Sequence, residues 1–296
     1  MDDGTNAECH IKGNFRIRGI RSTSPVAVGD YVQVQTQEDG TNWIADIEDR
    51  RNYIIRRATN LSKESHILAA NIDQAALIVT INHPVTSTTF IDRFLATCEA
   101  YRVRAILIFN KIDLLTEEEM AQLAELRALY ESIGYETLAI CAKDMGNTEY
   151  GIQHTDLFSL LKGKTTLLSG NSGVGKSTLL NALFGKEMTR TGNISDAHNK
   201  GMHTTTFSEM YFLPDGAVID TPGIKGFGAV AMEKEEVGHY FREIFETSHN
   251  CRFSNCLHTG EVGCAVQEAV IKGIIPISRY DSYLSLLGDC SESKYR

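Results

Sequence analysis

The chain has 296 residues, of which 42 % are apolar and 23 % are charged, and its formal net charge is −9. These values are ordinary for a soluble globular protein of two or three domains, and the acidic balance argues against a general polyanion binder. The N-terminus lacks a signal-peptide pattern and no stretch approaches the length of a membrane span. We therefore expect a cytoplasmic protein that binds no membrane.

The N-terminal region has the pattern of β-structure. Over residues 11–57, short runs such as YVQVQT (31–36) and WIADIE (43–48) alternate in polarity. The segment EDGTNW (38–43) between them is typical of a hairpin turn. A small barrel or sheet fits this pattern, and we place a first domain at residues 1–66.

From about Asp73 the pattern changes to that of an α/β domain. Continuous apolar runs at 75–81 and 104–110 predict strands that are buried on both faces, and residues 88–102 between them have helical spacing. The alternation continues and predicts a parallel sheet covered by helices on both faces. The further predicted elements are a helix over 116–133, a strand over 135–141, a helix over 155–162, a strand over 165–169 and a helix from Lys176.

The segment GNSGVGKST, between a predicted strand and a predicted helix, has the pattern of a phosphate-binding loop. Its glycines let backbone N–H groups surround phosphate oxygens, and the helix N-terminus adds a partial positive charge. Lys176 can reach the β- and γ-phosphates, and the Ser177 hydroxyl can bind Mg²⁺. The candidate GTP-binding residues of this loop are Gly170, Asn171, Ser172, Gly173, Val174, Gly175, Lys176, Ser177 and Thr178.

A second motif, NKID, follows a predicted buried strand and should recognise the base. Its candidate residues are Asn110, Lys111 and Asp113. The Asp113 carboxylate can accept hydrogen bonds from the N1–H and 2-amino groups of guanine, a donor pair that adenine lacks. A turn at a strand end explains an isolated four-residue match equally well, but the phosphate loop in the same sheet favours a guanine site. Cys141 and Ala142 follow another strand and should lie beside the base.

Two further loops should sense the γ-phosphate. In DTPG (220–223), Asp220 can hold Mg²⁺ through water and the Gly223 N–H can contact the phosphate. In GMHTTT (201–206), one threonine would complete the Mg²⁺ shell with Ser177. A solvent-facing β-edge is the alternative for TTT, but its place between the phosphate loop and DTPG favours the metal role.

The motifs follow one another as base loop, phosphate loop, threonine loop and DTPG. The phosphate loop usually comes first, so this order predicts a circularly permuted P-loop GTPase domain, which we place at residues 67–230. DTPG then leads directly into the C-terminal region. Ordering of these loops by GTP, and its loss on hydrolysis, could therefore be transmitted to an attached domain.

A cysteine cluster lies in the C-terminal region, which otherwise has a helical pattern and which we place as a domain at 231–296. Three thiols and one imidazole within fourteen residues suit a closed tetrahedral Zn²⁺ site that folds the segment. A disulfide is the weaker interpretation in the cytosol. His249 is a competing ligand. The predicted ligands are Cys251, Cys256, His258 and Cys264.

Taken in this order, NKID, GNSGVGKST, GMHTTT, DTPGIKGFG and the cysteine cluster resemble the ribosome small subunit-dependent GTPase A family over nearly the whole chain. The resemblance implies an OB-fold β-barrel, a permuted GTPase domain and a mainly helical zinc domain. It implies Mg²⁺-dependent GTP hydrolysis in late maturation of the small ribosomal subunit. It also implies rRNA binding, stimulation by that subunit and release after hydrolysis. We expect a monomer.

The residue that follows DTPG is Ile224, which cannot orient the attacking water as the glutamine of Ras-like GTPases does. The resemblance implies that His203 takes this catalytic role and that Thr205 is the Mg²⁺ ligand. An exposed loop histidine is the alternative for His203. Such a histidine acts only when its loop is ordered, which predicts slow turnover alone and stimulation by a partner.

The first residues match the middle of the family's OB domain, so we expect an incomplete barrel. Action on the large subunit and a non-catalytic, GTP-dependent RNA-binding role are the two rival functions. Basic residues of the N-terminal region should lie near rRNA phosphates. They are Lys12, Arg16, Arg18, Arg21, Arg50, Arg51, Arg56 and Arg57.

Overall fold

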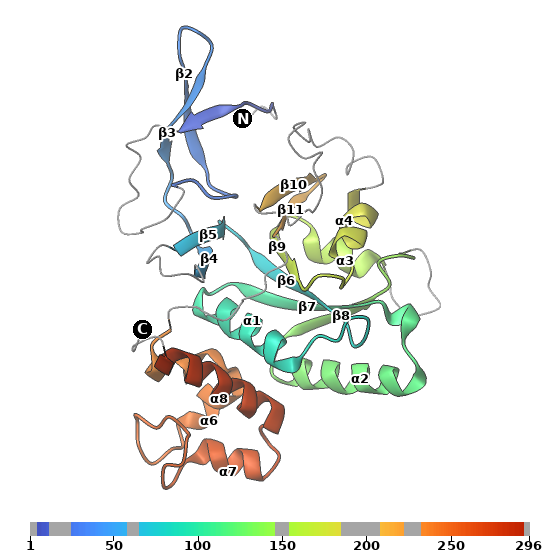
Figure 1. Ribbon diagram of the computed structural model, residues 1–296, viewed down its shortest axis with the longest axis vertical. Coiled ribbons are helices and arrows are strands. Elements are labelled where there is room, and N and C mark those ends of the chain that lie inside the picture. The colour runs from blue at the N-terminus through green and yellow to red at the C-terminus, as the bar shows by residue number, and fades with distance from the viewer. Residues whose placement is uncertain are drawn as a thin grey trace.

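The structure is a computed structural model that describes residues 5–11, 25–57, 65–145, 154–184, 208–221 and 232–292. These residues form an N-terminal β region, a central α/β domain and a helical C-terminal region (Figure 1). Among the described helices, none combines the length and the apolar character needed to cross a membrane.

The N-terminal β region contains two small sheets. The first has the order β1-β3-β2, formed by β1 (Cys9–Ile11), β2 (Val32–Thr36) and β3 (Asn42–Ile47). The predicted hairpin turn joins β2 to β3, with Gly40 at a positive φ of 84° that favours glycine. The second sheet pairs β4 (Tyr53–Arg57) with β5 (Ser65–Ala70), a strand that was not predicted. The expected barrel includes residues 12–24, which lie outside the described residues.

Arg50 corrects one expectation about rRNA contacts. Its guanidinium forms two hydrogen bonds to Asp30, from Nε to Oδ1 and from Nη2 to Oδ2, both at 2.6 Å. The side chains of Arg50 and Asp30 are only 7 % and 0 % exposed. This bidentate pair occupies the arginine, so Arg50 stabilises the β region and is not available to an rRNA phosphate.

The central domain is built on a six-stranded sheet with the order β10-β11-β9-β6-β7-β8, in which only the edge strand β10 is antiparallel to its neighbour. β9 carries the phosphate loop and lies between β6 and β11, although β6, β7 and β8 precede it in the chain. The strands are β6 (Gln74–Val79), β7 (Arg104–Asn110), β8 (Glu136–Ile140), β9 (Thr165–Gly170), β10 (Glu209–Leu213) and β11 (Gly216–Asp220).

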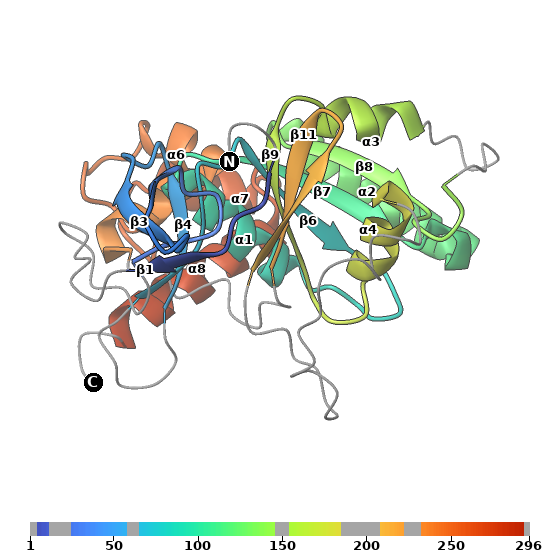
Figure 2. The same ribbon diagram turned by 90° about the horizontal axis from the view of Figure 1, so that it is seen from above.

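Helices cover both faces of this sheet (Figure 2). One apolar cluster fills the space under α1 (Thr88–Ala100) and α2 (Glu117–Ser132). A second cluster lies under α3 (His154–Leu161) and α4 (Lys176–Phe184). Thr116 and Glu119 begin α2 with a capping box. The bounds predicted for helices and strands of the central domain agree with the observed elements within two residues.

The C-terminal region packs against α1. It consists of a 3₁₀ helix η3 (Lys234–Tyr240) and the helices α6 (Arg242–Ser248), α7 (Ala265–Ile271) and α8 (Ile277–Glu292). Its apolar core is continuous with α1 through the buried residue Ala96. The helical region therefore packs on α1, on the side of the sheet that α1 covers (Figure 1).

A buried charge network strengthens this contact. Arg279 of α8 is 1 % exposed and binds Asp92 of α1 at 2.7 Å and Glu243 of α6 at 2.6 Å. Tyr130 of α2 donates a hydrogen bond to the same oxygen of Asp92. Burial raises the pKa of Asp92, while Arg279 opposes that shift. Loss of one partner would leave an unpaired buried charge, which is strongly destabilising. The network therefore holds α8 in a defined position on α1.

Candidate active site and metal centre

The phosphate loop runs from the end of β9 to the start of α4, as predicted. Gly173 and Gly175 have positive φ angles of 86° and 96°, which curl the loop. A Cβ on Gly175 would lie 2.3 Å from Nδ2 of Asn110, so only glycine fits there. The close approach links the phosphate loop directly to the base motif.

Lys176 and Asp220 meet across the sheet. β11 pairs in parallel with β9, which places Asp220 beside Leu168, two residues before the phosphate loop. Nζ of Lys176 donates to Oδ1 of Asp220 at 2.6 Å and to the carbonyl oxygen of Thr221 at 2.9 Å. Burial raises the pKa of Asp220, and the lysine opposes that shift. Asp220 contacts Lys176, and the next residue, Ser177, is exposed at the start of α4. A carboxylate and a hydroxyl are oxygen ligands that suit Mg²⁺.

Asn110 holds the base loop to the phosphate loop. Its side chain is 3 % exposed and donates from Nδ2 to the carbonyl oxygen of Val174 at 2.8 Å. Its Oδ1 accepts from the N–H of Ala142 at 2.9 Å. One amide therefore joins the base loop to the phosphate loop and to the segment that begins at Cys141.

Lys111 also contacts the phosphate loop, from a left-handed backbone conformation with φ of 64°. Its Nζ donates to the carbonyl oxygens of Gly173 at 2.6 Å and His83 at 2.5 Å. His83 was not recognised from the sequence. It follows β6, which lies between the strands of the phosphate and base loops. Because ligands bind at the carboxyl ends of the central strands in such sheets, the position of His83 after β6 could have identified it from the sequence.

These loops enclose a cavity of about 360 Å³. Asp113, half-buried in the short 3₁₀ helix η1 (Ile112–Leu114), lines it. Burial raises the pKa of the adjacent Cys141 thiol, and a hydrogen bond to Asp113 raises it further, so the neutral thiol can orient the carboxylate. The volume falls within the range of small-ligand sites. The lining residues are Asn110, Lys111, Asp113, Leu114, Ala142, Lys143, Gly175 and Thr178.

Four residues singled out from the sequence in the two γ-phosphate loops fall beyond what the structure describes, as do Lys12, Arg16, Arg18 and Arg21 of the predicted rRNA contacts. Gly223, expected at the γ-phosphate, and Ile224, which follows it, lie outside the described residues. The same holds for His203 and Thr205 of the threonine loop. Their roles remain predictions.

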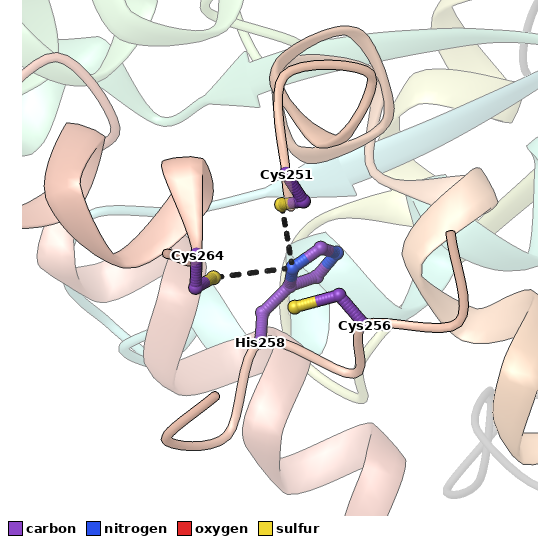
Figure 3. A group of neighbouring side chains, drawn as sticks. All are labelled: Cys251, Cys256, His258 and Cys264. Atoms are coloured by element: carbon purple, nitrogen blue, oxygen red, sulfur yellow. Dashed lines mark hydrogen bonds between the residues drawn. The ribbon is translucent and has the colours of Figure 1, made fainter. Parts of the chain in front are cut away.

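The predicted zinc ligands lie together (Figure 3). The ligand atoms of Cys251, Cys256, His258 and Cys264 are all within 4.8 Å of one another. Nδ1 of His258 is 3.6 Å from Sγ of Cys251 and 3.4 Å from Sγ of Cys264. Tetrahedral Zn²⁺ with ordinary bond lengths would separate N and S ligands by about 3.6 Å. The side chains therefore fit one zinc ion.

Surrounding contacts orient these ligands. Tyr283 donates to the carbonyl oxygen of Leu257 at 2.6 Å, and Tyr280 donates to that of His258. The N–H of Gln267 approaches Sγ of Cys264 at 3.4 Å, where Cys264 caps α7. His249, the competing ligand, is not in the cluster, and its ring packs against Phe245 at a centroid distance of 4.9 Å.

The chain is similar to known proteins over most of its length. A model of the RsgA GTPase family matches residues 47–230. A protein of Phocaeicola vulgatus named "Small ribosomal subunit biogenesis GTPase RsgA" is 59 % identical over 296 residues, which cover 100 % of this chain and 94 % of that protein.

Two solved structures are also similar. "Crystal structure of YjeQ from Thermotoga maritima" has a TM-score of 0.71 and 32 % identity, and the match covers 95 % of this chain and 89 % of that one. "The crystal structure of YloQ, a circularly permuted GTPase" has a TM-score of 0.71 and 31 % identity, with coverage of 98 % and 88 %. The chain therefore belongs to the RsgA GTPase family and is a circularly permuted GTP hydrolase.

Proposed function

We propose that this GTPase acts in late maturation of the small ribosomal subunit. It binds rRNA of that subunit in the GTP state, is stimulated by it and leaves after hydrolysis. The observation that carries the proposal is the full-length identity of 59 % to a relative named for small subunit biogenesis. A role on the ribosomal subunit also accounts for the expected cytoplasmic location.

In the proposed site, Asp113 reads the guanine edge, while Asn110 and Lys111 hold the base loop against the phosphate loop. Lys176 moves from Asp220 to the β- and γ-phosphates when nucleotide binds. Ser177, Asp220 and Thr205 would hold Mg²⁺, which neutralises charge on the phosphates. The Gly223 N–H contacts the γ-phosphate.

His203 would orient the attacking water in place of the glutamine of Ras-like enzymes. The structure describes no residue between 185 and 207, so this role rests on the sequence alone. Because the histidine acts only in an ordered loop, the subunit would supply the missing order. This dependence on the subunit supports slow GTP turnover by the protein alone and faster turnover on the subunit.

Co-sedimentation with isolated ribosomal subunits tests the proposal. With a non-hydrolysable GTP analogue, we expect binding to the small subunit and little binding to the large one. With GDP, binding to the small subunit should fall because the γ-phosphate loops lose their ligand. Preferential binding to the large subunit, or equal binding with both nucleotides, would contradict the proposal.

A His203→Ala variant separates the catalytic role from the non-catalytic rival. It should bind the small subunit with the analogue as the unchanged protein does. With GTP it should remain bound, because hydrolysis no longer triggers release. Normal release of this variant with GTP would favour the non-catalytic role of hydrolysis.

A further inference from the structure

A second cleft lies at the amino-terminal ends of the central strands, whereas the nucleotide cavity lies at their carboxyl ends. It has a volume of about 500 Å³, and its lining residues lie at the end of α1, at the start of β4 and between β5 and β6. Its loops precede β6 and β7, whereas the nucleotide loops follow those strands. The cleft is therefore separate from the GTPase site. Its lining residues are Arg51, Asn52, Tyr53, Ile72, Asp73, Ala100, Tyr101 and Arg102.

Arg102 occupies an unusual position at the end of α1. Its φ of 54° lies in the left-handed region, which favours glycine just after a helix. Backbone hydrogen bonds from Arg102 to Glu99 and from Val103 to Cys98 close the helix end. The Arg102 side chain is exposed and makes no hydrogen bond or ion pair with any other residue that the structure describes. A strained backbone therefore presents a free cation at the cleft.

The other charges of the cleft balance each other. Nη2 of Arg51 binds Oδ1 of Asp73 at 2.7 Å, and the second oxygen of Asp73 accepts from the N–H of Thr165 at 2.8 Å. Both oxygens of Asp73 thus accept hydrogen bonds from other groups. The charge of Arg102 is therefore left uncompensated. Arg51 itself remains 61 % exposed. The lining therefore favours an anionic ligand.

Two aromatic rings complete the lining. The rings of Tyr53 and Tyr101 are 5.8 Å apart and tilted by 53°. Both residues are half-buried, so part of each side chain remains accessible from the cleft. Aromatic faces beside a basic group are the chemistry by which proteins bind single-stranded nucleic acids, through base stacking and phosphate contact.

We propose that this cleft binds one unpaired nucleotide of RNA. The base contacts the Tyr53–Tyr101 pair, and the phosphate contacts Arg102. A cavity of this size suits a single nucleotide rather than a duplex. The proposal rests on the proposed function, which supplies RNA as the macromolecular ligand, but it concerns a site distant from the GTPase cavity.

The test is binding of a fluorescent oligoadenylate RNA to the full-length, GDP-saturated protein at several salt concentrations. Oligoadenylate lacks guanine, and GDP occupies the nucleotide cavity. In Arg102→Gly the glycine accepts the left-handed backbone, so the variant should unfold at no lower temperature. We expect weaker RNA binding and a slope of log K against log salt that is shallower by about 0.7, the value for one phosphate contact.

Two further variants sharpen the result. Tyr53→Leu should weaken binding about 5- to 150-fold through lost stacking, with the salt slope unchanged. Lys272→Ala removes an equal charge at a 64 % exposed position after α7, a helix that contributes no residue to the cleft, and should leave both affinity and slope unchanged. AMP in place of RNA tests a free nucleotide as the ligand.

Unchanged affinity and slope in Arg102→Gly would overturn the proposal, as would tight binding of AMP without binding of RNA. These results leave the proposed function intact if the unchanged protein still binds the small subunit in the GTP state. Failure of that subunit binding would instead contradict the proposed function, whatever the cleft binds.

Discussion

Replacing Asp113 by asparagine should lower kcat/KM for GTP by about 10²- to 10⁴-fold and create activity toward xanthosine triphosphate. The carboxylate lines the nucleotide cavity, where it can accept from the two N–H donors of guanine. An asparagine amide presents one of its own donors to that edge and leaves a buried polar group unmatched. Xanthine carries an oxygen in place of the 2-amino group, so it can accept from the asparagine.

Steady-state turnover with GTP, xanthosine triphosphate and ATP measures this change. Asp144→Asn is the matched control, because Asp144 is exposed and does not line the cavity. It should retain the specificity of the unchanged protein. If Asp113→Asn kept full GTP turnover and gained nothing with xanthosine triphosphate, the base would be recognised elsewhere.

Loss of zinc should unfold the segment around the cysteine cluster. Structural zinc sites contribute about 10–16 kcal/mol of apparent binding free energy at neutral pH, which exceeds the total stability of most domains. Burial and the neighbouring Cys264 and Cys251 raise the pKa of the Cys256 thiol to about 12, so a bound cation is needed to stabilise the thiolates. We expect one zinc per chain, and we expect Cys264→Ser to lose it and to expose residues 251–271 to rapid hydrogen exchange.

Single substitutions assign the ligands. His258→Ala should lose zinc, whereas His249→Ala should keep it, because His249 packs against Phe245 outside the cluster. Cys9→Ala, at a cysteine of the N-terminal sheet, should also keep one zinc per chain. GTP binding should survive zinc loss, since the cavity residues belong to the central domain. Retention of zinc by both Cys264→Ser and His258→Ala would contradict this assignment.

The sequence was most informative where local physics determines the structure. β7 occupies residues 104–110 as predicted, because a continuous apolar run there is buried on both faces of the sheet. The glycines of the phosphate loop were recognisable because their conformations exclude other residues. The four ligands of the cysteine cluster lie close in sequence, so their spacing indicated a metal site, although it left His249 as an alternative to His258.

Contacts between distant segments could not be predicted in this way. β5 and β10 were missed, and both are short strands at the edges of their sheets. Arg50 appeared to be a surface cation, yet it pairs with Asp30 twenty residues away. Arg279 is buried because α1 and α6 bring two carboxylates to it, and the pattern of α8 does not reveal that environment.

GTP turnover by the purified, zinc-loaded protein tests the central claim most directly. It would be measured alone, with isolated small ribosomal subunits and with isolated large subunits. We predict slow turnover alone and with large subunits, and an increase with small subunits toward the ~10³- to 10⁵-fold range of partner-stimulated GTPases. Equal turnover in all three mixtures, or stimulation by the large subunit, would contradict a GTPase whose switch loops are completed by the small subunit.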